Sequence, residues 1–149
     1  MAPGKHRWGR SQKYHERPRH LYALLFGNGC CYIGQTVNLN ARLSQHKSPA
    51  GGWAGNVFTM VPLGVVHCTQ QCGEDYEYAW RYKAACAGWR VYGKPGVFIN
   101  PARRLTLERR MLAWSLTWPK AHHRAMGCMP VLVVIGFLLI IVAAMASGM

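Results

Sequence analysis

Two apolar runs near the start of the chain predict a β-hairpin. Residues 21–27 and 30–36 are both of strand length and are separated by Asn28-Gly29. Asn-Gly is the dipeptide best suited to a two-residue type I′ turn, because both positions of that turn need positive φ. A third short strand is expected at residues 64–68, which read GVVHC.

Two helices are expected beside these strands. Asn38 can cap a helix that carries Leu39 and Leu43 on one side. Residues 74–87 are helical in pattern, with acidic residues in the first turn and Gly88 just beyond the end. These elements predict an α/β (α+β) domain with a small three-stranded, mainly antiparallel sheet flanked by helices.

The final segment of the chain has no charged residue. Residues 131–149 read VLVVIGFLLIIVAAMASGM, and at about 1.5 Å per residue a helix of this length crosses most of a hydrocarbon layer of about 30 Å. We expect one transmembrane helix at 129–149 in contact with membrane lipid, with a buried core helix as the alternative. Basic residues precede this segment and none follows it, so the positive-inside rule predicts a tail-anchored membrane protein with its N-terminal domain in the cytoplasm.

A basic segment, residues 101–128, precedes this apolar end. Leu107, Met111, Trp114 and Trp118 recur at helical spacing with arginines between them, a pattern typical of an amphipathic helix. The apolar side of this helix either packs on the domain or lies at the headgroup level of a membrane.

The chain is strongly basic, with 18 Lys and Arg against five Asp and Glu and a net charge of +13. This balance excludes an acidic solvating chain and predicts affinity for nucleic acid phosphates or anionic lipid. Residues 1–20 and 101–128 each carry six of the cations. We therefore expect a flexible basic arm at 1–19 and a compact domain at 20–100.

Several short motifs occur in a defined order within that domain. In chain order they are His20-Leu21-Tyr22, Tyr32-Ile33-Gly34, Gln35-Thr36, Asn38-Leu39, Arg42-Leu43, Gln45-His46, Gly51-Gly52, Val65-Val66 and Tyr76-Glu77-Tyr78-Ala79-Trp80. This series resembles the GIY-YIG nuclease family, and within it the structure-selective endonuclease branch. The first triplet departs from the family pattern, because it keeps the tyrosine but lacks the glycine. The zinc-binding recognition domain often attached to that branch has no counterpart in this sequence.

The resemblance implies hydrolysis of a phosphodiester with one divalent metal ion, Mg²⁺ or Mn²⁺, and no small-molecule cofactor. Glu77 falls on the family's metal position, and a hard cation needs only one or two carboxylates because water and phosphate supply its other ligands. The alternative is a surface glutamate paired with Arg81 one helical turn later. Arg42 is expected to stabilise the pentavalent phosphate through its planar guanidinium, unless it is only a solvated helix residue. His46 follows Arg42 by one turn and can accept a proton from, or hydrogen-bond to, a tyrosine hydroxyl.

Tyr22 and Tyr32 are the two candidate catalytic tyrosines. Tyr22 is expected to receive the proton of the attacking water, with help from the metal, Arg42 or His46, because a free tyrosine has a pKa near 10. With a two-residue turn, the two tyrosines lie on different faces of the hairpin, and a bulge or bend is needed to bring both hydroxyls to one site. The alternative is that both are ordinary aromatic residues packed in the sheet.

Four further residues are expected to contact the substrate: Gly34, Gln35, Thr36 and Asn100. The absence of a side chain at Gly34 lets the backbone approach a phosphate closely. Asn100 is a candidate for the family's final asparagine, but Asn100-Pro101 is equally typical of a helix N-cap followed by proline.

The sequence thus predicts a metal-dependent endonuclease that acts on DNA and is tethered to a membrane. Likeness to the structure-selective branch indicates branched or flapped DNA as the substrate. The alternative is a catalytically inactive, membrane-anchored DNA-binding module. Retention of Tyr22, Arg42, His46 and Glu77 argues against that alternative.

Overall fold

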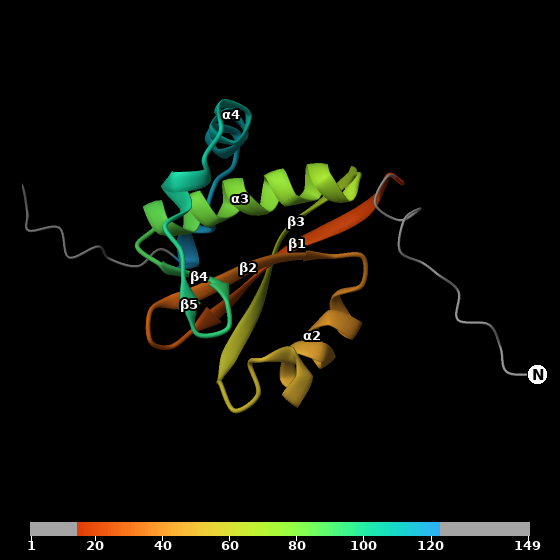
Figure 1. The fold of residues 1–149 in the computed structure, drawn as a ribbon, viewed down its shortest axis with the longest axis vertical. Helices are drawn as coiled ribbons and strands as arrows, with labels where there is room; N and C mark the ends of the chain where they lie inside the picture. Colours follow the sequence, from red (N-terminus) through yellow and green to blue (C-terminus); the bar gives the residue numbers. More distant parts are fainter. Residues whose placement is uncertain (1–14, 123–149) are drawn as a thin grey trace, which may run out of the picture.

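The computed structural model describes residues 15–122, which form one five-stranded sheet with helices on both faces (Figure 1). The strands are β1 (Arg17–Phe26), β2 (Cys30–Thr36), β3 (Phe58–Cys68), β4 (Arg90–Lys94) and β5 (Val97–Phe98). The helices are α2 (Leu39–Lys47), α3 (Gln70–Cys86) and α4 (Leu107–Ser115). Short 3₁₀ turns occur at η1 (Pro49–Gly51), η2 (Pro101–Arg104) and η3 (Lys120–His122).

The sheet is mixed and has five strands, so the prediction of three strands is wrong. Its order is β3-β1-β2-β4-β5, in which β1 is antiparallel to β2 and β3 while β4 is parallel to β2. β4 and β5 have little signal in the sequence, because the two strands are short and bury only Val91. The α+β class with flanking helices is confirmed.

The predicted elements α2, β3 and α3 are all present. α2 begins where it was predicted to begin, and β3 and α3 begin earlier than predicted. α2 begins after Asn38, whose side-chain oxygen accepts a hydrogen bond from the Ala41 amide at 3.0 Å, as predicted. β3 begins at Phe58 rather than at Gly64. α3 begins earlier than predicted, because Thr69 provides its N-cap and accepts a hydrogen bond from the Cys72 amide.

The loop between β1 and β2 contains three residues, and the predicted two-residue type I′ turn is wrong. The Phe26 carbonyl accepts a hydrogen bond from the Gly29 amide at 3.2 Å, and Gly29 is the residue of this loop with positive φ, at 83°. The additional loop residue changes the register, so that Leu24 lies opposite Tyr32 and Tyr22 lies opposite Gly34. Because residues two apart on a strand share a face, Tyr22 and Tyr32 lie on the same face of the hairpin. No bulge in the hairpin is needed to bring them together, contrary to the prediction.

Two apolar clusters cover the two faces of the sheet. On one face, side chains of β1 and β2 pack against α3, where Trp80 and Ala84 are buried. On the other face, Tyr22, Leu24 and Phe26 pack around Trp53, with Leu39 of α2 beside them. The two catalytic candidates on β1 and β2 therefore belong to the α2 side of the sheet.

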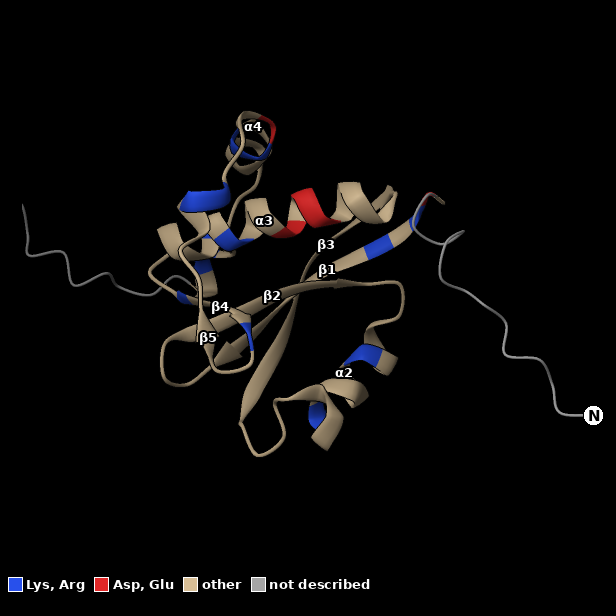
Figure 2. Ribbon diagram, in the orientation of Figure 1, with Lys and Arg blue, Asp and Glu red and all other residues tan. Residues whose placement is uncertain are grey.

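Charge is distributed unevenly over the described residues. Three of the five acids of the chain, Glu74, Asp75 and Glu77, lie on α3. Lys and Arg lie on most of the other elements (Figure 2). The surface around α3 is therefore the place where acidic and basic groups meet.

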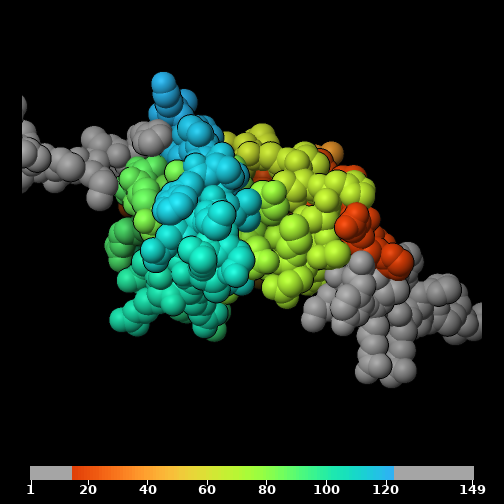
Figure 3. Space-filling view, turned by 90° about the horizontal axis from the view of Figure 1, so that it is seen from above, coloured from red at the N-terminus to blue at the C-terminus, as the bar shows by residue number. Residues whose placement is uncertain are grey.

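The segment after β5 is not the continuous amphipathic helix that the spacing predicts. It consists of η2, the short helix α4 and η3, and it lies across one end of α3 (Figure 3). α4 buries Ala113 and leaves Leu107, Met111 and Trp114 exposed at 68%, 59% and 70%. These three side chains do not pack on the domain. Trp118 follows the end of α4 and is buried against Trp80, with the two ring centroids 6.1 Å apart.

Two sequence predictions lie mainly or entirely outside the described residues. These are the flexible basic arm at 1–19 and the transmembrane helix at 129–149. Among residues 15–122, no helix has both the length and the apolar composition that crossing a bilayer requires.

Candidate active site

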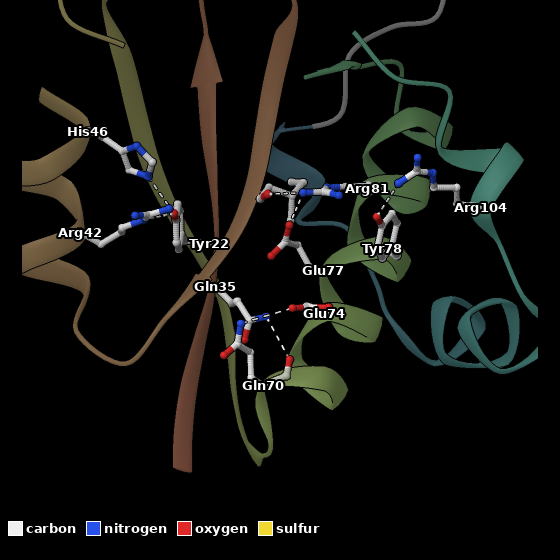
Figure 4. A network of polar contacts seen from close by, with 11 residues as sticks. Tyr22, Gln35, Arg42, His46, Gln70, Glu74, Glu77, Tyr78, Arg81 and Arg104 are labelled. Atoms are coloured by element: carbon white, nitrogen blue, oxygen red, sulfur yellow. Dashed lines mark hydrogen bonds and ion pairs between the residues drawn. The ribbon is translucent and has the colours of Figure 1, made fainter. Parts of the chain in front are cut away.

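The candidate site lies where one edge of β2 is open. β4 pairs with β2 only at Cys30, Cys31 and Tyr32, so within residues 15–122 the rest of β2 has no strand on that side. α2 lies on one face of the sheet at this point and α3 lies on the other. Side chains from both helices therefore reach the same open edge (Figure 4).

Tyr22, Arg42 and His46 form a hydrogen-bonded group on the α2 side. The Arg42 Nε donates to the Tyr22 hydroxyl oxygen at 3.0 Å, and that oxygen lies 2.7 Å from His46 Nε2. Burial, with a contribution from the Arg42 charge, lowers the pKa of His46 to about 4, so the imidazole is neutral at physiological pH. The Tyr22 hydroxyl can then accept from Arg42 and donate its own proton to His46 Nε2. The prediction that His46 interacts with a tyrosine hydroxyl agrees with this geometry.

The two tyrosines differ in their access to solvent. Tyr22 is 0% exposed, and burial raises its pKa to about 12 although the hydrogen bond from Arg42 opposes the shift. Tyr32 lines a pocket of about 240 Å³ together with Arg42, His46 and Trp53. Burial also raises the pKa of Tyr32, while Arg42 and Arg81 lower it. Of the two hydroxyl-bearing rings, Tyr32 is the one that borders an open space.

Gly34 allows the Tyr22 ring to lie against the backbone of β2. A Cβ at this position would lie 2.5 Å from the Tyr22 hydroxyl oxygen and 3.0 Å from a ring carbon of Tyr32. Real Cβ atoms do not approach other atoms as closely as the first of these distances. The glycine that was predicted to admit a phosphate is therefore also required by the packing of the two tyrosines.

We predict that Gly34→Ala lowers the free energy of unfolding by about 1–3 kcal/mol, the usual cost of overpacking a buried site. Tyr22 cannot move away freely, because Arg42 and His46 hold its hydroxyl. Denaturant unfolding measures the effect. Gly27→Ala is the matched control, since a Cβ at Gly27 meets no atom within 4 Å. Equal stability of the two variants would contradict the close contact.

Glu77 and Arg81 form the second half of the site, on α3. They make an ion pair one helical turn apart, and their side chains are only 15% and 9% exposed. Arg81 also donates to the Ile33 carbonyl at 3.4 Å, which lies on the open edge of β2. The pairing of Glu77 with Arg81 that the sequence offered as an alternative is present, but the pair is buried at the site and not on a solvated surface.

The Glu77 carboxylate has the features of a ligand for a hard divalent cation. Its Oε1 atom is held by Arg81, whereas Oε2 accepts no hydrogen bond from the described residues. Burial raises the pKa of Glu77, and the neighbouring Arg81 opposes this shift. No group of three or more His, Cys, Asp or Glu residues that could hold a metal occurs within residues 15–122. Mg²⁺ does not require one, because it is usually bound by one or two carboxylates plus water and phosphate.

The two halves of the site share one pocket. Arg42 and Glu77 both line a hollow of about 470 Å³, together with Gln35 and Arg81. The two halves of the site influence each other electrostatically. Arg42 on the α2 side lowers the pKa of Glu77, and Glu77 on α3 raises the pKa of Tyr22. The fold thus brings together residues that lie more than thirty positions apart in the sequence.

The predicted substrate-binding residues fall into different places. Gln35 lines the shared pocket, and its side chain contacts the Gln70 carbonyl at 3.4 Å. The Thr36 hydroxyl contacts the backbone of Asn38 at 3.1 Å and stabilises the turn into α2. Asn100 caps η2 by accepting a hydrogen bond from the Ala102 amide at 3.0 Å, which is the structural alternative that the sequence left open. Asn100 lines an adjacent pocket and not the shared one.

Three residues near the site were not predicted to belong to it. Arg19 is buried, donates to the Cys68 carbonyl at 3.1 Å and lines the shared pocket. Trp53 is 4% exposed and packs on Tyr32. Arg81 appeared in the sequence only as a possible partner of Glu77. All three residues are buried, and sequence alone does not reveal burial.

The residues of the site follow a fixed order along the chain, from the two hairpin tyrosines to the glutamate of α3, and this order can be compared with known protein families. Residues 19–84 match the family model of the GIY-YIG catalytic domain. The comparison with curated proteins found no match, and neither did the comparison with solved structures.

The match covers most of the described site and confirms the resemblance to the GIY-YIG catalytic domain. It includes Tyr22, Tyr32, Arg42, His46 and Glu77, and it ends before β4 and Asn100. GIY-YIG domains are endonuclease domains, so the match implies phosphodiester hydrolysis in general terms. Nucleases of this type generally use a divalent metal ion, with which the free Oε2 of Glu77 is compatible.

Proposed function

We propose that the protein is a metal-dependent endonuclease that hydrolyses phosphodiester bonds of DNA. The observation that carries the proposal is the shared pocket, in which Arg42 from α2 and Glu77 from α3 meet at the open edge of β2. A scaffold that only bound DNA would have no need for a buried carboxylate beside the phosphate site. The inactive DNA-binding module is therefore the less favoured function.

Arg42 is proposed to stabilise the charge that develops on the phosphate. Its Nε is held by Tyr22, and its Nη1 donates to the Gln45 side chain, so the guanidinium is fixed before substrate binds. A preorganised donor avoids the cost of reorientation during the reaction, which is the main source of electrostatic catalysis.

Tyr32 is proposed to receive the proton of the attacking water, in place of Tyr22. A general base must come within hydrogen-bond distance of the water that it activates. The Tyr22 hydroxyl is buried and already engaged by Arg42 and His46. Tyr32 borders the pocket of about 240 Å³, which Arg42 also lines. Tyr22 then acts as a positioning residue that fixes Arg42 and His46.

Glu77 is proposed to hold the divalent metal ion through its free carboxylate oxygen. A bound cation would supply Lewis-acid stabilisation of the phosphate and would lower the pKa of nearby acids. Arg81 keeps the Glu77 side chain directed at the pocket and at the edge of β2.

We predict that the cleavage rate rises with pH between 6 and 9, by up to about tenfold per unit, because the reacting form of Tyr32 is the phenolate. Burial raises the pKa of Tyr32, so its phenolate fraction keeps growing across this range. His46, with its pKa lowered to about 4, stays neutral throughout and contributes no inflection. Single-turnover rates at saturating DNA and metal measure the profile. An inflection near pH 6.5 that disappears in His46→Gln would assign the titration to His46 instead.

The substrate is proposed to be branched or flapped DNA, on the basis of the likeness of the motifs to the structure-selective branch. The test is an assay of the full chain with labelled branched and linear duplexes, with Mg²⁺ and with EDTA. We expect Mg²⁺-dependent cuts near the branch point. Equal cutting of branched and linear DNA would contradict the preference, and no cutting of either DNA would contradict the nuclease.

We also propose that the protein is held at the cytoplasmic face of a membrane by residues 129–149. The absence of charge from 131 to 149 supports this, as does the exposed apolar side of α4, which precedes that segment in the sequence. We expect the full chain to stay with membranes in alkaline carbonate, and the variant Val134→Arg/Leu138→Arg to be released. Release of the parent chain by carbonate would contradict the anchor.

A further inference from the structure

A second pocket of about 440 Å³ adjoins the candidate active site. It lies between α3, the β4–β5 hairpin and η2, and it shares Tyr78, Arg81 and Gly93 with the pocket that contains Arg42 and Glu77. A molecule that occupied both pockets would pass over Gly93. Most of the second pocket, including Lys94 and η2, lies beyond the segment that matches the GIY-YIG family.

The lining of this pocket is cationic and contains no acid. Lys94, Arg103 and Arg104 contribute side chains to it, and all three residues are exposed. The Arg104 side chain donates to the Tyr78 hydroxyl at 3.2 Å, which directs it toward the boundary with the active site (Figure 4).

The three cations have no counterion among residues 15–122. All five acids of the sequence lie within the described residues. Glu77 and Asp75 pair with Arg81 and Arg109, and no ion pair within residues 15–122 involves Lys94, Arg103 or Arg104. Three neighbouring unpaired cations beside a phosphate-cleaving site are a binding surface for a polyanion.

We infer that Lys94, Arg103 and Arg104 bind the backbone phosphates of the DNA strand on one side of the scissile bond. This rests on the proposed nuclease function and adds to it the path of the strand, from the active-site pocket over Gly93 to η2. The contacts are made to phosphates, so they position the strand and do not read its sequence.

The test compares two double variants that remove the same charge. Arg103→Gln/Arg104→Gln alters the pocket, and Arg110→Gln/Lys120→Gln removes two exposed cations that do not line it. The affinity of the full chain for a labelled DNA duplex is measured by fluorescence anisotropy over a series of salt concentrations. EDTA is present, so the measurement does not depend on cleavage and can succeed or fail separately from the nuclease proposal.

We expect the pocket variant to bind more weakly and to reduce the slope of log affinity against log salt by about 1.8, because each lost phosphate contact on duplex DNA removes about 0.9. The control variant should keep the parent slope. Equal loss in both variants, or no loss in the pocket variant, would overturn the inference. If the pocket variant has a lower melting temperature than the control, the single variant Arg103→Gln replaces it, because that side chain makes no hydrogen bond within residues 15–122, and the expected change in slope is then about 0.9.

Discussion

Glu77→Gln should reduce the rate of DNA cleavage by about three orders of magnitude, because Lewis-acid stabilisation by a metal is worth several kcal/mol and each 1.36 kcal/mol is tenfold in rate. Glutamine keeps an oxygen for the contact with Arg81 but removes the negative charge that would bind the metal. DNA binding should be unchanged or slightly tighter, since an anion is removed from a surface that faces phosphate. Single-turnover kinetics and binding are measured on the same protein.

The choice of glutamine over alanine follows from the burial of the ion pair. Loss of one partner of a buried pair leaves an uncompensated charge and typically costs about 3–5 kcal/mol. Arg81 already has a buried Nε atom without a hydrogen-bond partner among the described residues. Glu77→Ala would therefore confuse loss of folding with loss of catalysis.

Glu74→Gln is the matched control for Glu77→Gln. Glu74 lies one turn earlier on the same helix and lines the same pocket, but its carboxylate accepts only a 3.4 Å contact from Gln70. We expect this variant to cut DNA at close to the parent rate. If Glu77→Gln also cuts near the parent rate, the assignment of the metal to Glu77 is wrong.

Arg42→Lys should lower the cleavage rate by about 10²–10³, the usual effect of removing one preorganised charged donor. Lysine keeps the positive charge, so DNA binding should change much less than the rate. It lacks the planar fork that donates from Nε to Tyr22 and from Nη1 to Gln45 while leaving a further donor for phosphate.

The control for Arg42→Lys is Arg110→Lys, the same substitution at an exposed position of α4 outside the pockets of the site. We expect no change in rate for this control. An unchanged single-turnover rate for Arg42→Lys at saturating DNA would make Arg42 a surface residue without a catalytic role.

The sequence was sufficient where a local signal determined the structure. Asn38 predicted the start of α2 because a side-chain cap acts over three residues. The motif order singled out Tyr22, Arg42 and His46, which the fold joins by hydrogen bonds, and Glu77, which lines the same pocket as Arg42. The sequence failed to predict β4, which pairs with β2 in parallel from more than fifty residues away and buries only Val91.

One residue of loop length explains the error about the tyrosines. A two-residue turn and a three-residue turn are both compatible with Gly27-Asn28-Gly29, and they place Tyr22 and Tyr32 on opposite faces or on the same face. Side chains alternate between the two faces of a sheet, so a shift of one residue in the loop moves Tyr22 and Tyr32 from opposite faces to the same face.

The orientation of α4 was left open by the sequence, which allowed its apolar side either to pack on the domain or to lie at a membrane. The helical spacing correctly placed Leu107, Met111 and Trp114 on one side, but periodicity does not determine which side faces the domain. Arg109, on the other side of the helix, pairs with Asp75 of α3 at 2.9 Å and stacks over Tyr78, and these contacts direct Ala113 inward. The side of α4 that faces α3 is thus the side that carries Arg109, and not the apolar side.

The most direct test of the central claim is the single-turnover cleavage of a labelled DNA branch by the full chain with Mg²⁺, beside an identically purified Tyr32→Phe protein. The site proposed here predicts that the parent protein cuts the DNA. It also predicts that Tyr32→Phe binds the same DNA with parent affinity and cuts it at least about a hundredfold more slowly, as expected for loss of a general base. Equal cleavage by the two proteins, or cleavage by neither, would contradict the account.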